Sequence, residues 1–144
     1  MAEYIVATAI EAKNEIRIEW YAYDLVTEEG IKVEVKSASY LQSWEQRDLS
    51  KISFDISPTK AWLRESNEYD SDVKRQADVY VFCLLNNTAK VTVDPLNIEQ
   101  WKFYILATKT LSKEKGIQKS IRLNSLLKLN PIETDYRGIN VQIY

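Results

Sequence analysis

The chain has 144 residues, of which three are glycine and three proline, and it is 45% hydrophobic and 28% charged. These proportions are typical of a soluble globular protein, and they exclude a disordered tail and a low-complexity chain. The length predicts one domain over residues 1–144. The formal net charge of −2 conceals an asymmetry, because residues 1–50 carry 10 acidic and 5 basic side chains, whereas residues 109–144 carry 3 and 7.

The chain contains no histidine and only one cysteine. Catalysis by a Ser-His-Asp or Cys-His arrangement is therefore excluded, and so are zinc sites built on imidazole or several thiolates. An enzyme with this composition must use carboxylates, lysine, hydroxyls or a hard cation such as Mg²⁺. Cys83 lies in an apolar run and is predicted to be a reduced core residue, which favours a cytoplasmic setting. No apolar run approaches the ~18–20 residues of a membrane span.

The first predicted elements are a helix from Glu3 to about Asn14 and a strand over 16–26. Residues 27–30 read Thr-Glu-Glu-Gly and predict a turn, and strict alternation of apolar and charged residues over 31–39 predicts a second strand. These two strands are expected to form an antiparallel hairpin.

The later elements indicate helices packed on a sheet. Their expected order is an irregular or helical stretch to Gln46, a strand at Ile52–Ile56, a loop over 57–72 with a short helix at Thr59–Arg64, strands at Val79–Leu85 and Trp101–Thr108, short helices at about 110–115 and 124–129, and a last strand at Ile139–Tyr144. This order predicts the α/β class, with a central mixed β-sheet flanked by helices.

The hairpin is the candidate functional site. Glu34 and Lys36 project from one face of their strand, because side chains alternate along it. A turn centred on Glu29 places Asp24 opposite Glu34, with Cβ atoms ~4.5–5.5 Å apart. Two adjacent carboxylates are destabilising unless something neutralises them, and a divalent cation together with the Lys36 ammonium would do so. Such a group suits metal-assisted phosphodiester hydrolysis, although Glu and Lys also alternate on the solvated face of many ordinary strands.

Three segments of the chain form a recognisable pattern: Glu3-Tyr4-Ile5-Val6-Ala7, Tyr23-Asp24-Leu25 and Val33-Glu34-Val35-Lys36-Ser37-Ala38. With this pattern the chain resembles the PD-(D/E)XK nuclease superfamily. The resemblance implies a restriction-endonuclease-like fold and a DNA endonuclease that depends on Mg²⁺ or Mn²⁺. It implies that Asp24 and Glu34 bind the metal, that Lys36 is catalytic and that Glu3 adds a carboxylate. Members of the superfamily often carry a glutamine shortly after the lysine, and the resemblance implies that either Gln42 or Gln46 fills that position. Tyr23 stands where the motif has proline.

A nuclease of this kind needs a surface for nucleic acid, and DNA is the expected partner. The candidate contacts are the tryptophan that follows the Lys36 strand and a set of basic residues: Trp44, Lys51, Lys113, Lys115, Lys119 and Arg122. The resemblance also allows a homodimer, since many enzymes of this fold cut both strands as dimers.

Two other functions are compatible with the same residues. The first is a catalytically inert module that binds nucleic acid or protein on the same fold. The second is a structural or regulatory protein in which the hairpin charges are merely solvated.

Overall fold

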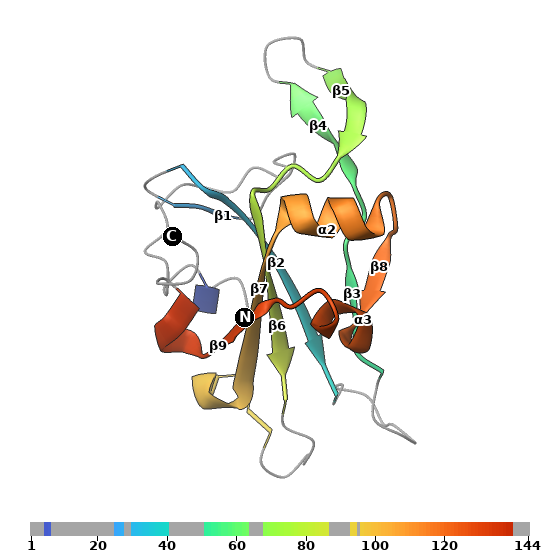
Figure 1. The fold of residues 1–144 in the computed structure, drawn as a ribbon. Coiled ribbons are helices and arrows are strands. Elements are labelled where there is room, and N and C mark those ends of the chain that lie inside the picture. Colours follow the sequence, from blue (N-terminus) through green and yellow to red (C-terminus); the bar gives the residue numbers. More distant parts are fainter. Residues whose placement is uncertain are drawn as a thin grey trace.

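A computed structural model of the chain shows a mixed α/β fold (Figure 1). It describes residues 5–6, 25–27, 30–40, 51–63, 68–86, 93–94 and 96–139, and over 59–63 and 68–74 it describes the backbone. The predicted α/β class with a central mixed sheet is confirmed. No helix among these residues is both long enough and apolar enough to cross a membrane.

The central sheet has five strands in the order β1-β2-β6-β7-β9. Strand β2 pairs with β6 in parallel, and the other three pairings are antiparallel. The strand bounds are Leu25–Val26 for β1, Lys32–Ser39 for β2, Val79–Leu85 for β6, Trp101–Ala107 for β7 and Ile132–Thr134 for β9. The strands expected at 31–39, 79–85 and 101–108 are confirmed, and within 16–26 the described residues Leu25–Val26 are extended as expected.

Strand β6 is buried along its whole length and separates two hydrophobic cores. Val79, Val81 and Cys83 face the first core, whereas Tyr80 and Phe82 face the second. A strand covered on both faces reads as a continuous apolar run, which explains why the sequence identified it correctly. Val33 and Val35 of β2 belong to the first core, together with the helical residues Ile5 and Val6. Those two residues are the described part of the helix expected from Glu3 to Asn14.

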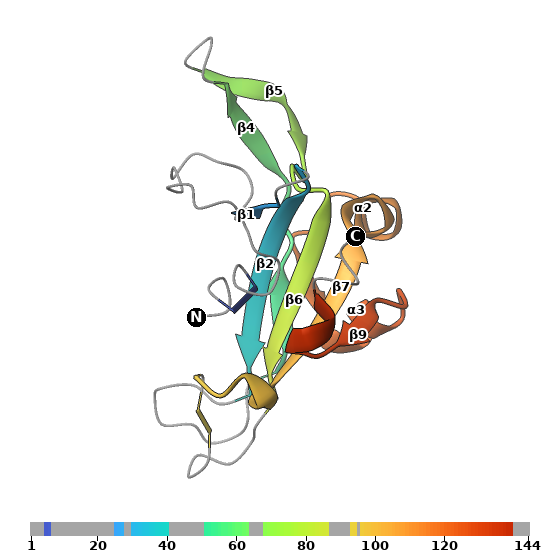
Figure 2. The same cartoon turned by 90° about the vertical axis from the view of Figure 1, so that its left-hand side faces the viewer.

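The second core lies between the central sheet and a layer built from β3 (Ser53–Asp55), β8 (Ser120–Arg122), α2 (Thr108–Lys115) and α3 (Leu123–Leu127). Strands β3 and β8 pair antiparallel, and Phe54 packs edge-on against Phe82 with ring centroids 5.0 Å apart. Helices α2 and α3 lie on one side of the sheet, and residues 5–6 lie on the other (Figure 2). The sheet is therefore covered on both faces, as expected, and the predicted strand at 52–56 and both short helices are confirmed.

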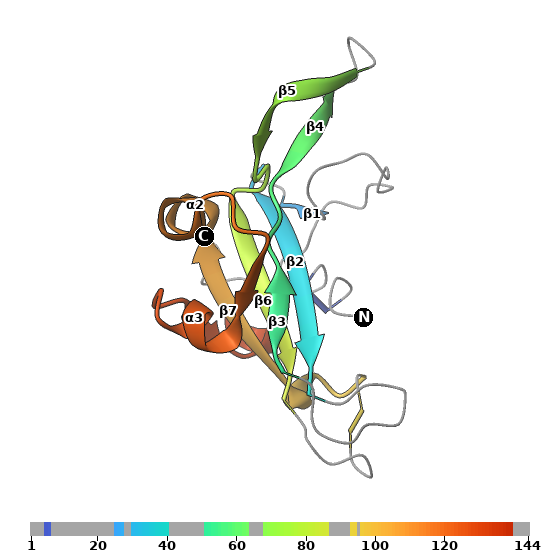
Figure 3. The same cartoon turned by 90° about the vertical axis from the view of Figure 1, so that its right-hand side faces the viewer.

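The expected loop over 57–72 with a helix at Thr59–Arg64 is wrong. This region contains the antiparallel strands β4 (Thr59–Leu63) and β5 (Glu68–Lys74), which project away from the central sheet (Figure 3). The register shifts between Lys60 and Trp62, as at a β-bulge. A bulge interrupts the period of two by which strands are identified, so the sequence pattern is lost where the hairpin forms.

The last predicted strand, Ile139–Tyr144, is wrong at Ile139, which is helical and buried. It follows the 3₁₀ turn η2 (Tyr136–Gly138), and residues 140–144 lie outside the described part of the chain. The edge position of the sheet is occupied by β9 instead, and another 3₁₀ turn, η1 (Ile98–Gln100), precedes β7. Strands of three residues, such as β8 and β9, are too short for a hydrophobic period to be recognised.

Candidate active site

The hairpin of β1 and β2 has the predicted register. Leu25 pairs with Val33 and Val26 with Lys32, so paired positions add up to 58. The turn is closed by Thr27, whose N–H donates to the carbonyl of Ile31 at 2.9 Å and whose Oγ1 accepts from the N–H of Ile31 at 3.1 Å. Gly30 has a φ of 89°, a conformation that glycine adopts without steric cost. The turn chemistry thus fixes which residues of the two strands face each other.

Glu34 and Lys36 lie on the β2 face that looks toward the second core, opposite Tyr80 and Phe82 of β6. The Lys36 Nζ is 3.2 Å from Oε1 of Glu34, and the two side chains are 25% and 16% exposed respectively. Because the pair is mostly withdrawn from water, its electrostatic interaction is screened less than that of an ordinary surface pair. The structure therefore brings together two of the predicted site residues.

Asp55, at the end of β3, is a second carboxylate near Lys36 that was not among the predicted site residues. Its Oδ1 accepts hydrogen bonds from the backbone N–H of Ser57 at 2.8 Å and from Ser57 Oγ at 2.7 Å. These bonds lower the pKa of Asp55, burial opposes the shift, and the Lys36 ammonium lowers the pKa further. The Asp-x-Ser spacing directly after a predicted strand is a turn signature that could have identified it.

The hydrogen bonds to Asp55 predict an acid-sensitive contribution to stability. A carboxyl with a lowered pKa in the folded state stabilises the fold above its ordinary pKa, and the contribution is lost as the pH falls through the folded value. Replacing Ser57 by alanine removes the side-chain donor, so the acid unfolding transition should move to higher pH. Unfolding followed by circular dichroism from pH 6 to pH 2 measures this shift, and an unchanged midpoint would contradict the assignment.

Several predicted site residues lie outside the described part of the chain: Glu3, Asp24, Gln42, Trp44 and Gln46. The observed pairs are Leu25–Val33 and Val26–Lys32, and the pairing of Asp24 with Glu34 stays a prediction. Within the described residues, no group of three or more acidic, cysteine or histidine side chains is placed to hold a metal ion. The metal site therefore stays a prediction that depends on Asp24 and Glu3.

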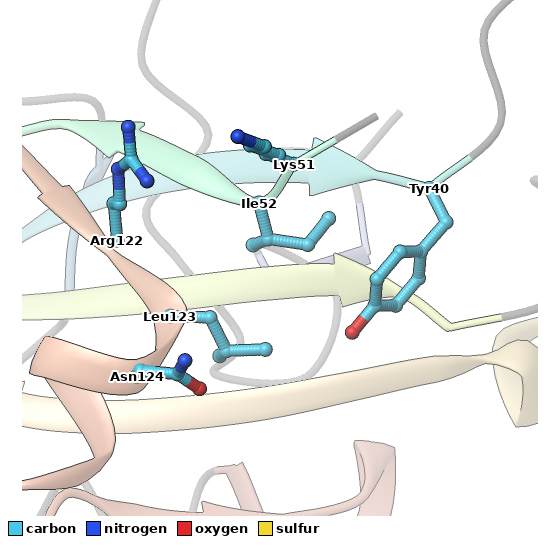
Figure 4. Close-up of a pocket in the computed structure, with 6 residues that line it drawn as sticks. All are labelled: Tyr40, Lys51, Ile52, Arg122, Leu123 and Asn124. Atoms are coloured by element: carbon cyan, nitrogen blue, oxygen red, sulfur yellow. The ribbon is translucent and has the colours of Figure 1, made fainter. Parts of the chain in front are cut away.

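The predicted nucleic-acid contacts divide into two sets. Lys51 and Arg122 line the same surface pocket (Figure 4). Lys113 and Lys115 lie in the last turn of α2, and Lys119 precedes β8. All five are at least partly exposed. None of the last three is among the described residues that line the pocket.

Cys83 is fully buried, as predicted, and burial raises the pKa of its thiol. The Cys83 thiol is kept protonated and inaccessible, so it is not a nucleophile. Trp101 is likewise a core residue, with 8% of its surface exposed. The carboxylates and lysine around β2 are consequently better placed for chemistry than this cysteine.

Fold and site together define a mixed α/β protein with a carboxylate–lysine pair on strand β2 of the central sheet. Residues 1–125 match the family model described as bacteriophage T4 endonuclease IV, and the chain belongs to that family. The expectation of an endonuclease is thereby confirmed. A search of curated proteins found no match to the chain.

Proposed function

We propose that the protein is a metal-dependent DNA endonuclease of the PD-(D/E)XK type. Membership of an endonuclease family supports phosphodiester hydrolysis, and the name of that family supports DNA as substrate by analogy with the phage enzyme. The observation that carries the proposal is the 3.2 Å Glu34–Lys36 pair in the Glu-x-Lys arrangement on one face of β2.

The donor chemistry suits Mg²⁺ or Mn²⁺, because Glu34 offers carboxylate oxygens and Asp24 is expected to follow in the hairpin register. Asp24 and Glu34 would hold the ion, with Glu3 as a further carboxylate and Gln42 beside them. When bound, the ion would neutralise the two carboxylates and supply Lewis-acid stabilisation of the phosphate.

Lys36 has two roles in this proposal. Its ammonium would orient the attacking water and offset the negative charge that develops on the phosphate. Glu34 keeps that ammonium in place, since the two side chains are in direct contact on adjacent positions of the same strand face. Limited exposure at both residues strengthens the interaction with a phosphate compared with the same groups in open water.

Incubation with plasmid DNA tests the proposal directly. We expect nicking or linearisation in the presence of Mg²⁺ or Mn²⁺, and none when EDTA is added. Cleavage that persists in EDTA would overturn the metal requirement, and binding without cleavage under all metal conditions would instead support an inert DNA-binding module.

Asp24→Asn provides an independent test of the carboxylate pair. If Asp24 and Glu34 face each other, this substitution relieves a like-charge repulsion and stabilises the metal-free protein by up to about 1 kcal/mol. Thermal unfolding in EDTA measures the effect. If Asp24→Asn unfolds in EDTA at a lower midpoint temperature than the unmodified protein, the two carboxylates are not a close pair. Added Mg²⁺ should stabilise the unmodified protein more than the variant.

A further inference from the structure

A surface pocket lies at the end of β2, away from the Glu34–Lys36 pair. Its volume is about 340 Å³, which is within the ~300–1,000 Å³ range of small-ligand sites. The described residues that line it are Tyr40, Lys51, Ile52, Arg122, Leu123 and Asn124. They come from segments far apart in the sequence, and Figure 4 shows Tyr40, Ile52, Leu123 and Asn124 near one another, with the charged ends of Lys51 and Arg122 at the outer edge.

The backbone holds this pocket in a fixed arrangement. The N–H of Leu123 donates to the carbonyl of Ile52 at 3.2 Å, next to the Ser53–Arg122 pair of the β3–β8 ladder. Ile52 is 6% exposed and belongs to the second core, and Leu123 and Tyr40 pack against that core. The pocket is therefore preformed on packed strands, which reduces the entropy cost of binding a ligand.

The lining combines three kinds of group. Tyr40 and Leu123 are half-buried and give aromatic and aliphatic surface, and the largely buried Ile52 lies between them and the core. Asn124 is exposed and has both a donor and an acceptor in its amide. Lys51 and Arg122 are exposed cations, and no carboxylate is among the described residues that line the pocket. An apolar wall, an amide and two cations match the base and the phosphates of a nucleotide.

We infer that this pocket binds one nucleotide of the DNA strand beside the cleavage site. The inference rests on the proposed nuclease function and assigns a part of its substrate to residues outside the Glu34–Lys36 pair. The base lies against Tyr40, Ile52 and Leu123, and the Asn124 amide contacts its polar edge. Lys51 and Arg122 contact the adjoining phosphates.

The distance between the pocket and Lys36 determines how many nucleotides separate the bound nucleotide from the cleavage site. Tyr40 is four residues after Lys36 and on the same face of the chain, which corresponds to ~13 Å along an extended strand. In B-form geometry this spans about four nucleotides at ~3.4 Å each, and a more extended strand spans fewer. The pocket should therefore influence the choice of base at a fixed position within about four nucleotides of the cut.

Mapping of cleavage sites on end-labelled DNA tests the base contact. Asn124→Ala should reduce the preference at that position by about tenfold, because one specific base contact is lost. Lys51→Ala and Arg122→Gln should each raise KM without changing the base preference. Each should also reduce, by about one, the slope of the logarithm of the DNA-binding constant against the logarithm of salt concentration, because one phosphate contact is lost. Lys128→Ala is the matched control, since Lys128 is an exposed lysine that follows α3 and does not line the pocket. An unchanged cleavage pattern in Asn124→Ala would overturn the inference.

Titration with deoxynucleoside 5′-monophosphates separates this inference from the proposed function, because it needs no cleavage. We expect amide NMR signals of Ile52 and Leu123 to shift with nucleotides, and these shifts to weaken in Asn124→Ala. Identical shifts with inorganic phosphate would leave no role for the base and overturn the inference, as would the absence of any shift. If nucleotides bind here but the protein cleaves no DNA, the nuclease proposal fails while the pocket assignment stands.

Discussion

Lys36→Ala is expected to reduce DNA cleavage by about 10²- to 10⁴-fold while leaving the fold intact. The range is that of a positioned proton-transfer or charge-stabilising group removed from a catalytic site. Because the Lys36 side chain is only 25% exposed, circular dichroism and thermal unfolding of the variant must match those of the unmodified protein before the loss is assigned to catalysis. The loss should appear in the single-turnover rate constant for cleavage, since the ammonium acts on the attacking water and the phosphate.

Lys102→Ala is the matched control for this substitution. Lys102 lies on β7 of the same sheet, and its Nζ is 3.6 Å from Oε1 of Glu133, so the control removes a Lys–Glu pair of the same type. That pair is about half exposed, and it lies on strands other than the hairpin. Cleavage by Lys102→Ala should match that of the unmodified protein. Equal cleavage by Lys36→Ala would remove Lys36 from the mechanism.

Arg75→Met is expected to cause the largest loss of stability, about 3 kcal/mol or more. Arg75 is 8% exposed, and its guanidinium donates to the carbonyls of Ile56 and Gln118, each at 2.8 Å, and to that of Gly116. It also donates to Ser112 Oγ at 3.3 Å. These partners are uncharged, and a charged hydrogen bond to each is worth about 1.5–3 kcal/mol. Methionine fills similar space but leaves the carbonyls without their donor.

Thermal unfolding measures the effect of Arg75→Met. For a chain of this size, 3 kcal/mol corresponds to a fall in Tm of roughly 10 °C. Arg75→Lys should recover only part of the loss, because an ammonium cannot reach all of these carbonyls in the planar geometry of guanidinium. Lys128→Met is the control, and it should change Tm little because Lys128 is exposed. A small effect at Arg75 would mean that solvent or neighbouring groups satisfy the carbonyls.

The hairpin and the buried strands could be predicted because their signals are local. Strict alternation from Ile31 to Ser39 fixes which face of β2 carries Glu34 and Lys36, and the turn at Thr27–Gly30 fixes the register. The continuous apolar run over 79–85 identifies β6 as a strand covered on both sides. In each case the chain segment itself contains the physical cause of the structure.

The parts that sequence reasoning missed depend on contacts between distant segments. Asp55 is near Lys36 only because β3 folds back beside β2. Arg75 lies 43 positions before Gln118, whose carbonyl it binds, so no local pattern indicates that it joins these segments. The pocket likewise combines Tyr40 with Arg122 and Asn124. The strands β4 and β5 were missed for a different reason, because the bulge between Lys60 and Trp62 interrupts the alternation of side chains by which a strand is recognised.

Paramagnetic broadening by Mn²⁺ tests most directly whether the carboxylates of the first hairpin hold a metal ion. Substoichiometric Mn²⁺ is added to isotope-labelled protein, and the amide signals are followed by NMR. We predict that broadening is centred on the signals of Glu34 and Lys36 and is reversed by excess Mg²⁺. Broadening centred elsewhere, such as on Glu133 of β9, would contradict this assignment. The assignment would also be contradicted if the hairpin signals were unaffected at a Mn²⁺ concentration that supports DNA cleavage.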